Sequence, residues 1–273
     1  MTALTFTLKT PPEFTLDVSP LVPDNLEGKT TGKINNISLA YGNRSVKVTE
    51  LFSVKGNNPN QVRIENSCDK LTCIGKGITK GTIEIKGDAG NYLGQGMKNG
   101  TISVDGNTGS WTGNRMAGGR INISGNAADY VGAGLPGDVH GMTDGLISIK
   151  GNAGDRTGDR MRRGIIIIQG TSGNYCGSRI HAGTIIALGK AGTYPGAGMR
   201  RGTILLARKP ARMSATFKSC GYLEMQFLRL LFTQLANMDT DFEFFRKYRP
   251  IAQRLSGDLA RHGKGEILIL KQQ

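Results

Sequence analysis

The clearest feature of this sequence is an alternation of aliphatic and polar residues that returns at a fixed interval. Each instance opens with a glycine, and aliphatic residues follow two and four positions later, as in Ile83/Ile85 and Ile102/Val104. Alternation of period two predicts a short β-strand with one buried face. The opening glycines are Gly81, Gly100, Gly119, Gly145, Gly164, Gly183 and Gly202, at intervals of 19, 19, 26, 19, 19 and 19 residues. The longer interval contains an insertion of seven residues within the segment Leu135–Asp144.

Other positions of the 19-residue repeat recur as well. Further glycines follow six and thirteen positions after the opening glycine, and an aromatic residue usually stands at the eleventh, as at Tyr92 and Trp111. One such unit buries too little apolar surface to offset its loss of backbone entropy, so the units must stack. We therefore predict an all-β chain built on a right-handed parallel β-helix with about 19 residues per coil. Equivalent side chains, such as those of Ile83, Ile102 and Ile121, should lie over one another.

Both ends of such a column need a cover, because open strand edges invite pairing with other chains. We predict an N-terminal β-rich cover over residues 1–60, the solenoid over residues 61–209 and a mainly helical cap over residues 210–273. In the N-terminal part we expect strands at Thr5–Leu8 and Phe14–Val18. Irregular first coils of the solenoid are expected at Ser45–Val48 and Val62–Ile64.

The C-terminal part shows helical spacing of apolar residues after Pro210. The residues expected on one helical face are Leu223, Phe227, Leu231, Leu235 and Met238. A second helical stretch is predicted from Ile251 to Leu259, and Glu266–Leu270 is expected to form a last strand.

Composition agrees with a solenoid and limits the class of protein. The chain has 273 residues and 40 glycines, but no Gly-X-Y period that would indicate collagen. Met1–Lys9 does not resemble a leader peptide, and no apolar stretch approaches the length of a membrane span, so we expect a cytoplasmic protein with no membrane partner. The four cysteines, Cys68, Cys73, Cys176 and Cys220, fit no zinc, redox or disulfide spacing.

Charge adds a candidate binding site. The net charge is +14, and the stretch from Arg160 to Leu223 contains eleven basic residues and no acidic residue. In a solenoid, basic residues at equal repeat positions stack, and stacked guanidinium groups repel unless an anion meets them. The residues predicted to contact an anion are Arg160, Arg162, Arg163, Arg179, Arg200 and Arg201. A solvated basic face is the alternative.

Groups that could carry catalysis are scattered. The acidic residues of the repeats do not recur at one position, as Asp88 and Asp105 illustrate, and the histidines His140, His181 and His262 are far apart in sequence and in repeat position. Cys176 has no apparent base and is expected to be inert. We therefore predict neither a catalytic residue nor a metal site in this chain. Arg156 takes the place of an aromatic residue in its repeat, and we expect it to stack on neighbouring rings.

These repeats resemble a known family. The spacing of glycines resembles the Gly-x-Gly-x-Gly β-helix shared by glutamate synthase C-terminal domains and the C (gamma) subunit of formylmethanofuran dehydrogenase. The resemblance to that gamma subunit extends over essentially the whole chain. The chain looks most like the gamma subunit of the bacterial formyltransferase/hydrolase complex. The segments that carry it are Leu26–Lys29, Leu51–Val54, Leu135–Met142, Gly158–Gly164, Gly198–Gly202 and Gly263–Leu268.

The resemblance implies a function that the residues alone do not. Complexes of this family move a formyl group between tetrahydromethanopterin and a methanofuran-type cofactor. The bacterial complex hydrolyses the formyl group to formate, whereas the archaeal complex couples it to carbon dioxide through molybdenum or tungsten, and this chain leaves the two versions open. The gamma subunit is a non-catalytic scaffold in that scheme, with hydrolase-like, formyltransferase-like and further subunits as partners.

The cofactor expectation combines this resemblance with charge. The chain is expected to bind no cofactor by its own chemistry, but its arginines could hold the polyglutamate tail of a methanofuran-type cofactor within the complex. A stand-alone polyanion-binding module is the alternative function, and nucleic acid is not expected as a partner of the scaffold subunit. A glutamate-synthase-like role would need an amidotransferase and a flavin region beside this chain.

Overall fold

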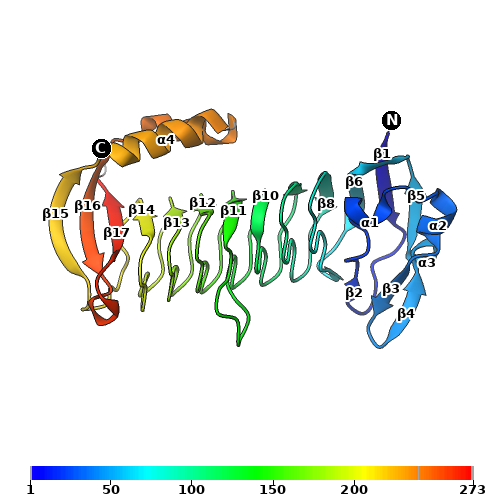
Figure 1. Ribbon diagram of the computed structural model, residues 1–273, viewed down its shortest axis with the longest axis horizontal. Helices are drawn as coiled ribbons and strands as arrows, with labels where there is room; N and C mark the ends of the chain where they lie inside the picture. Colours follow the sequence, from blue (N-terminus) through cyan, green and yellow to red (C-terminus); the bar gives the residue numbers. More distant parts are fainter. Residues whose placement is uncertain (1, 239, 272–273) are drawn as a thin grey trace.

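The computed structural model describes residues 2–238 and 240–271 as an elongated, mostly β molecule. The N-terminal and C-terminal parts lie at opposite ends of a row of short strands (Figure 1). Most strands belong to one sheet of thirteen, in the order β15-β16-β17-β14-β13-β12-β11-β10-β9-β8-β6-β1-β5. None of the described helices is long and apolar enough to cross a membrane.

The middle of this sheet is a parallel ladder in sequence order. Its strands are β6 (Asn58–Ser67), β8 (Thr82–Gly87), β9 (Thr101–Val104), β10 (Ala117–Ile123), β11 (Asp144–Ile149), β12 (Ile165–Ile168), β13 (Thr184–Ala187) and β14 (Thr203–Leu206). Ile83 pairs with Ile102, and Ile102 with Ile121, so the predicted stacking of equivalent residues is confirmed. Ile121 pairs with Ile147 across the insertion, which therefore leaves the register of the ladder unchanged.

A second ladder joins the same repeats away from the strands. Single parallel bridges link Ala89 to Thr108, Thr108 to Ala127, Ala127 to Ala153, and continue to Ala191. Each repeat thus contacts its neighbours at two places, and the chain between these places must turn sharply. Gly94 shows why glycine is needed at such a turn: its φ is +63°, and a Cβ there would lie 2.6 Å from Cδ1 of Ile121.

Two apolar cores form on the two faces of the large sheet. The larger core lies within the repeats and contains the stacked isoleucines together with buried methionines such as Met97 and Met116. The smaller core contains Ile167, Ile186 and Leu205, which face the opposite way and pack against helix α4 (Gln226–Met238). Helix α4 lies across the strands of the C-terminal half (Figure 1).

The N-terminal part adds a second sheet and three short helices. The remaining elements here are β1 (Ala3–Leu8), β2 (Leu16–Asp17), α1 (Pro23–Leu26), α2 (Thr31–Asn35), β3 (Ser38–Tyr41), β4 (Arg44–Lys47), α3 (Val48–Leu51), β5 (Phe52–Lys55) and β7 (Leu71–Thr72). Val62–Ile64 lies in β6 and joins the parallel ladder as predicted. The prediction of a coil at Ser45–Val48 is wrong, because β4 pairs antiparallel with β3 in a hairpin and Val48 begins α3.

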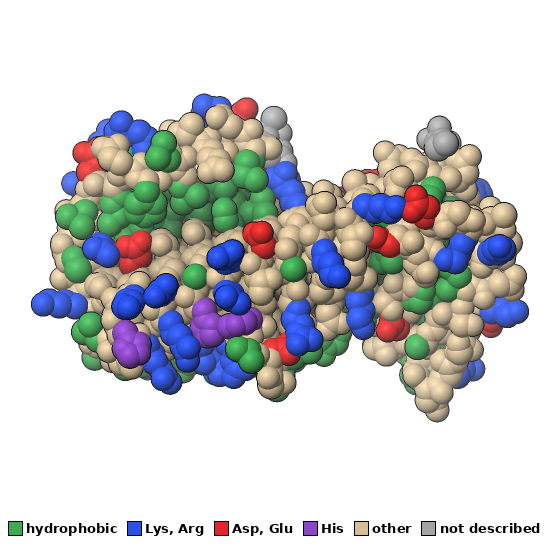
Figure 2. All heavy atoms as spheres, viewed as in Figure 1, with side chains coloured by type: hydrophobic (Ala, Val, Ile, Leu, Met, Phe, Trp, Pro, Cys, Tyr) green, Lys and Arg blue, Asp and Glu red, His purple; other side chains and the backbone are tan. Residues whose placement is uncertain are grey.

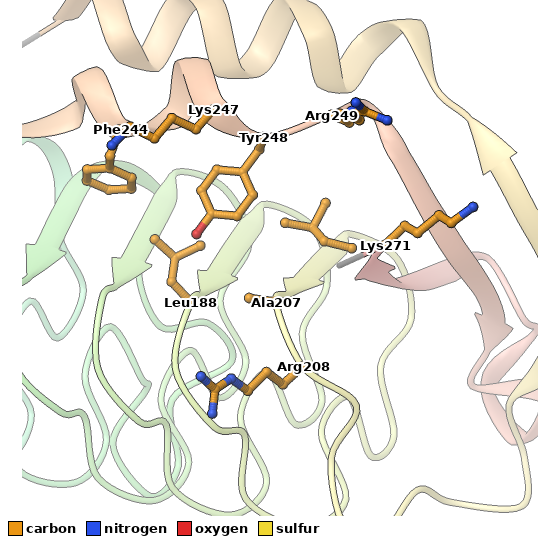
Figure 3. Close-up of a pocket in the computed structure, with 9 residues that line it drawn as sticks. Leu188, Ala207, Arg208, Phe244, Lys247, Tyr248, Arg249 and Lys271 are labelled. Atoms are coloured by element: carbon orange, nitrogen blue, oxygen red, sulfur yellow. The ribbon is translucent and has the colours of Figure 1, made fainter. Parts of the chain in front are cut away.

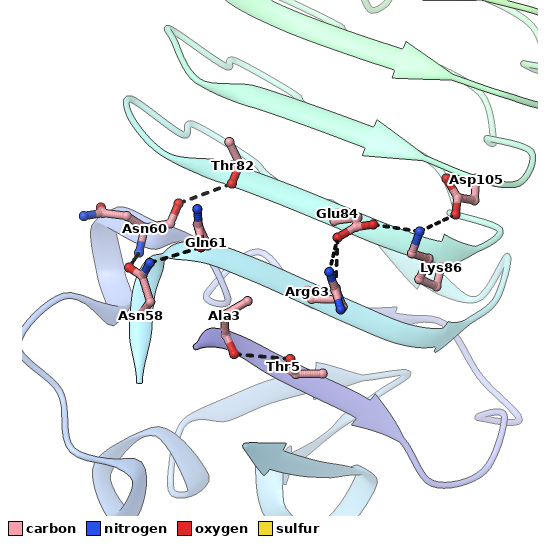
Figure 4. A network of polar contacts seen from close by, with 10 residues as sticks. All are labelled: Ala3, Thr5, Asn58, Asn60, Gln61, Arg63, Thr82, Glu84, Lys86 and Asp105. Atoms are coloured by element: carbon pink, nitrogen blue, oxygen red, sulfur yellow. Dashed lines mark hydrogen bonds and ion pairs between the residues drawn. The ribbon is translucent and has the colours of Figure 1, made fainter. Parts of the chain in front are cut away.

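The network in Figure 4 ties the first strands of the ladder together by charge. The Arg63 guanidinium of β6 pairs with the Glu84 carboxylate of β8 at 2.8 Å. The Lys86 ammonium then joins Glu84 to Asp105, with both contacts at 2.7 Å. These side chains lie on the solvent face, so they add cross-strand contacts without entering the core.

The C-terminal part contains more strand than the sequence predicted. Its elements are β15 (Lys218–Glu224), α4, the 3-10 helices η1 (Thr240–Lys247) and η2 (Leu259–Arg261), β16 (Ile251–Gly257) and β17 (Gly265–Leu270). The strand predicted at Glu266–Leu270 is confirmed, and it pairs with β14. The helix predicted at Ile251–Leu259 is wrong: β16 pairs antiparallel with both β15 and β17, so the sheet takes up its backbone hydrogen bonds.

The predicted face of the remaining helix is confirmed only at Leu235, which is buried, and at Leu231, which is partly buried against the smaller core. Leu223 belongs to β15, and Phe227 and Met238 are exposed. The residues of α4 that are buried are Leu228, Phe232, Leu235 and Ala236. This stretch carries apolar residues in two overlapping helical series, and packing against η1 and the sheet selects the second.

Candidate anion-binding site

The site is built on a column of backbone corners fifteen residues after each opening glycine. Arg115, Arg160 and Arg179 occupy this position with φ values of 54°, 58° and 52°. Other repeats place Gly96 and Gly198 at the same corner, with φ values of 64° and 73°. A left-handed conformation costs a non-glycine residue about 1–2 kcal/mol. Arginine at three corners where glycine would be relaxed indicates a role for these side chains.

Buried and backbone acceptors fix two of these arginines in place. Nε of Arg179 donates to Oδ1 of Asp159 at 2.9 Å, and its Nη2 also pairs with this carboxylate. Asp159 is 2% exposed and accepts a further bond from the Ser178 hydroxyl at 2.7 Å. The hydrogen bond to Asp159 raises the pKa of Arg179 above its ordinary value. Nη1 of Arg160 donates to the carbonyl of Asp138 at 2.6 Å, so this arginine holds the insertion.

The insertion folds back over the arginine corners. Asp138 lies at its centre: its Oδ1 is 3.2 Å from Nη2 of Arg115, and its Oδ2 accepts from the Leu135 amide at 3.0 Å. The amide of Gly141 donates to the carbonyl of Arg160 at 3.0 Å. Around this segment, Lys, Arg and His side chains gather on one side of the molecule (Figure 2).

Two clefts flank the insertion, and Arg160 and Arg179 line both. The first, of about 330 Å³, is lined by Trp111, Tyr130, Gly134, Leu135, Pro136, Arg156, Asp159, Arg160 and Arg179. The second, of about 350 Å³, is lined by Gly137, Asp138, Val139, Arg160, Arg179, His181, Gly198, Arg200 and Arg261. The two shared side chains make the clefts neighbours, so one extended anion could contact both.

The structure divides the six predicted arginines into two groups. Arg160, Arg179 and Arg200 come together at the clefts. Arg162, Arg163 and Arg201 are exposed and line neither cleft. Sequence reasoning missed Arg261, which the turn after β16 brings to the second cleft. There Oδ2 of Asp258 accepts from the Gly198 amide at 2.9 Å, and no feature of the sequence signals this contact.

The expectation that the histidines lie apart is wrong for two of them. The rings of His140 and His181 are 4.8 Å apart and nearly perpendicular, because the insertion folds back over the stacked repeats. Burial lowers the pKa of His181, and the nearby Arg200 lowers it further. Both effects favour the neutral imidazole, which offers polar contacts. Among the described residues, no three His, Cys, Asp or Glu side chains cluster as metal ligands would.

An aromatic ladder forms one wall of the first cleft. Trp111 stacks on Tyr130 with ring centroids 4.8 Å apart, and Tyr92 stacks on Trp111 at 5.7 Å. The guanidinium of Arg156 lies 5.0 Å from the ring centre of Tyr175, which confirms the predicted stacking. The same side chain lines the first cleft, so it adds positive charge beside the rings.

The remaining candidate groups have structural roles. Cys176 is buried, and burial raises its pKa to about 12, which favours the protonated thiol over the reactive thiolate. The carboxylates of Asp129 and Asp155 each accept a backbone amide of the next repeat at 2.7 Å. The arrangement as a whole can bind carboxylates or phosphates through guanidinium groups.

Comparisons with known proteins find the same glycine motif and a solved chain that matches nearly the full length of this one. The model of the GXGXG motif family matches residues 13–225. Among solved structures, the chain is similar to one from the formyltransferase/hydrolase complex (FhcABCD) of Methylorubrum extorquens, which was determined in complex with methylofuran. The two chains are 31% identical with a TM-score of 0.89, over 98% of this chain and all of the other.

Curated relatives match over a shorter segment. The C-type subunit of the tungsten-containing formylmethanofuran dehydrogenase 2 of Methanococcus maripaludis is 35% identical over 94 residues, which span 34% of this chain and 35% of that subunit. The C-type subunit of the molybdenum-containing formylmethanofuran dehydrogenase 1 of Methanosarcina barkeri is 36% identical over 80 residues, spanning 28% of this chain and 27% of that subunit. The matched segment thus spans about a third of the length of these relatives or less.

Proposed function

Because this chain belongs to the family of C-type subunits of formylmethanofuran dehydrogenase, which is built on the GXGXG motif, we propose that it is the scaffold subunit of a formyl-transferring complex. Its partners in this proposal are hydrolase-like and formyltransferase-like subunits and one further subunit. The observation that carries the proposal is the similarity to a chain of an assembled complex along 98% of this sequence.

We further propose that the stacked repeats form a right-handed parallel β-helix. The parallel ladder of β6 to β14 and the second ladder of single bridges support a chain that winds once per repeat. Right-handed crossovers are the rule for parallel strands. Such a rod presents the same repeat position at regular steps, which suits a protein that organises several neighbours along its length.

The two clefts are proposed to hold the polyglutamate tail of a methanofuran-type cofactor. Guanidinium groups bind carboxylates through paired hydrogen bonds. Arg200 and Arg261 both line the second cleft, and the described residues form no ion pair with Arg200, while Arg261 lies near enough to Asp258 to help lower the pKa of that carboxyl. Trp111 also lines the first cleft, and its indole N–H is buried with no hydrogen-bond partner in the described chain. When bound, the cofactor would supply the amine that carries the formyl group between subunits.

Co-purification tests the scaffold role. This chain, carrying the only affinity tag, is expressed together with the hydrolase-like and formyltransferase-like subunits of its own source, and the eluate is analysed by native mass spectrometry. We expect the subunits to co-elute at a fixed ratio and formyl transfer to require all of them. Elution of this chain alone, or formyl hydrolysis by this chain without the others, would contradict the proposal.

A further inference from the structure

A cavity of about 370 Å³ lies at the other side of the C-terminal half, away from the arginine corners. Its lining residues are Leu188, Ala207, Arg208, Phe244, Lys247, Tyr248, Arg249, Leu270 and Lys271. Leu188 and Ala207 follow strands β13 and β14, whereas Tyr248 and Arg249 connect η1 to β16 (Figure 3). The cavity thus opens where the helical layer, formed by α4 and η1, meets the sheet. It shares no lining residue with the two clefts.

The floor of this cavity is apolar and held in place by packing. Leu188, Phe244 and Tyr248 are partly buried and pack against the smaller core. The Tyr248 ring lies 5.9 Å from that of Phe232 and 6.1 Å from that of Phe245, so α4 and η1 both position it. Figure 2 shows an apolar band on the surface of this half of the molecule, below the layer formed by α4 and η1.

The charged side chains at the rim of the cavity are all basic. Arg208, Lys247, Arg249 and Lys271 line it, and no Asp or Glu is among its lining residues. Arg208 and Arg249 are exposed and form no hydrogen bond or ion pair within the described part of the chain. An apolar floor inside a cationic rim fits a ligand that is apolar at its centre and acidic at its edges.

We propose that this cavity and its cationic rim bind an acidic polypeptide segment of a partner subunit that inserts one or two apolar side chains. The cavity volume suits side chains of the size of Leu or Phe. Apolar surface is also exposed in a band along this half of the molecule (Figure 2), which favours an extended segment over a small isolated molecule. Buried apolar anchors ringed by complementary charge are the usual source of affinity at protein interfaces. This interface is additional to the cofactor clefts.

Peptide binding to the full chain tests the proposal. The probe is a fluorescein-labelled hexapeptide in which two acidic residues flank each side of a Leu-Phe pair, and binding is followed by fluorescence anisotropy. One matched peptide replaces the Leu-Phe pair with two serines, and another replaces the acids with their amides. We expect the first peptide to bind at least about tenfold more tightly than either control, a difference of about 1.4 kcal/mol.

Two variants locate the binding. Arg208→Glu/Arg249→Glu reverses the rim charge, and Ala207→Phe fills the floor without changing charge. Each is expected to weaken binding at least about tenfold. The matched control, Arg163→Glu/Arg201→Glu, makes the same charge change outside the cavity and its rim and should bind the peptide within about twofold of the wild-type chain. Circular dichroism confirms that each variant is folded.

Several outcomes would overturn the proposal. They are an absence of binding by the wild-type chain at millimolar peptide, equal binding of the serine peptide, and equal loss in the Arg163/Arg201 variant. Equally effective competition by a single-stranded DNA of matched charge would show that the cavity selects charge alone. None of these results bears on whether the chain co-purifies with its partners, so the assembly proposal is tested separately.

Discussion

At the scale of single residues, two glycines at the corners of the repeat allow the cost of a left-handed backbone to be measured apart from the cost of steric crowding. Gly94 and Gly96 have nearly equal φ values of +63° and +64°. A Cβ at Gly94 would lie 2.6 Å from Ile121, whereas one at Gly96 would meet nothing within 4 Å. We expect Gly94→Ala to lower the free energy of unfolding by about 2–4 kcal/mol, from strain and crowding together. Urea denaturation measures the loss.

Gly96→Ala is the matched control for this prediction. Only the conformational cost remains there, so we expect a loss of about 1 kcal/mol. Equal losses in the two variants would show that packing above Gly94 relaxes freely. The sequence predicted the glycine positions but not this difference, because the distance to Ile121 depends on the stacking of repeats. For the same reason the sequence placed the arginines at equal repeat positions without showing that Asp159 and Asp138 hold two of them.

Charge across the first strands makes stability depend on pH. The hydrogen bond from Lys86 holds the pKa of Glu84 below its ordinary value, and Arg63 adds to this effect. A depressed carboxyl pKa contributes stability above the unfolded-state value, and this contribution is lost as the pH falls through the folded-state value. We expect Glu84→Gln to lower the free energy of unfolding by roughly 0.5 kcal/mol at pH 7, because the pair is solvent-exposed.

Thermal melting at pH 7 and at about pH 3 measures this dependence, since both carboxyl states are sampled across that range. The difference between Glu84→Gln and the wild-type chain should be smaller at the acidic value than at pH 7. Glu13→Gln, at an exposed residue with no ion pair within the described chain, is the control and should melt like the wild-type chain at both values. A deficit of Glu84→Gln that stays as large in acid would assign its effect to packing.

At the scale of secondary structure, helix α4 tests which apolar face is buried. Phe232 is 3% exposed and stacks on Phe245, whereas Phe227 is 43% exposed. We expect Phe232→Ala to destabilise the helical layer by about 3–5 kcal/mol, the usual cost of removing a buried aromatic ring. Phe227→Ala should cost less than about 1 kcal/mol. Hydrogen exchange of α4 amides measures both, and a larger effect at Phe227 would favour the face predicted from sequence.

The sequence predicted secondary structure correctly inside the repeats and less well outside them. Within residues 81–206 the 19-residue period predicted each strand and the strand beside it, because equivalent residues of successive repeats pair with one another. Outside it, β16 was predicted as a helix, since a short apolar stretch fits both periods and only its neighbours β15 and β17 decide. The His140–His181 contact was missed because the insertion interrupts the repeat and the direction in which it folds has no sequence signal.

At the scale of the whole molecule, the two groups of arginines make different predictions for cofactor retention. Arg200→Ala/Arg261→Ala removes two guanidinium groups from the second cleft, whereas Arg163→Ala/Arg201→Ala removes two that line neither cleft. If the clefts hold a methanofuran-type cofactor as proposed, the purified complex should lose most of that cofactor only in the first variant. Retention by the wild-type complex should fall with salt, because screening weakens exposed ion pairs. Mass spectrometry of the released cofactor measures both effects, and equal losses would point to net charge instead of the clefts.

The regular repeat also allows the length of the rod to be changed by one step. Deleting residues 82–100 joins Gly81 to Thr101 and recreates the Gly-Thr-Ile sequence that opens β8, so Ile102 can take the place of Ile83 beside Val62. The chain should fold with one strand fewer and a rod shorter by about 4.8 Å. If the rod spaces its partners, each of them should still bind and formyl transfer between them should fall, because a misplacement of a few ångströms is costly to catalysis. Small-angle scattering and the coupled reaction rate measure the two effects, and an unchanged rate in a demonstrably shorter complex would show that the rod gathers its partners without setting the distance between them.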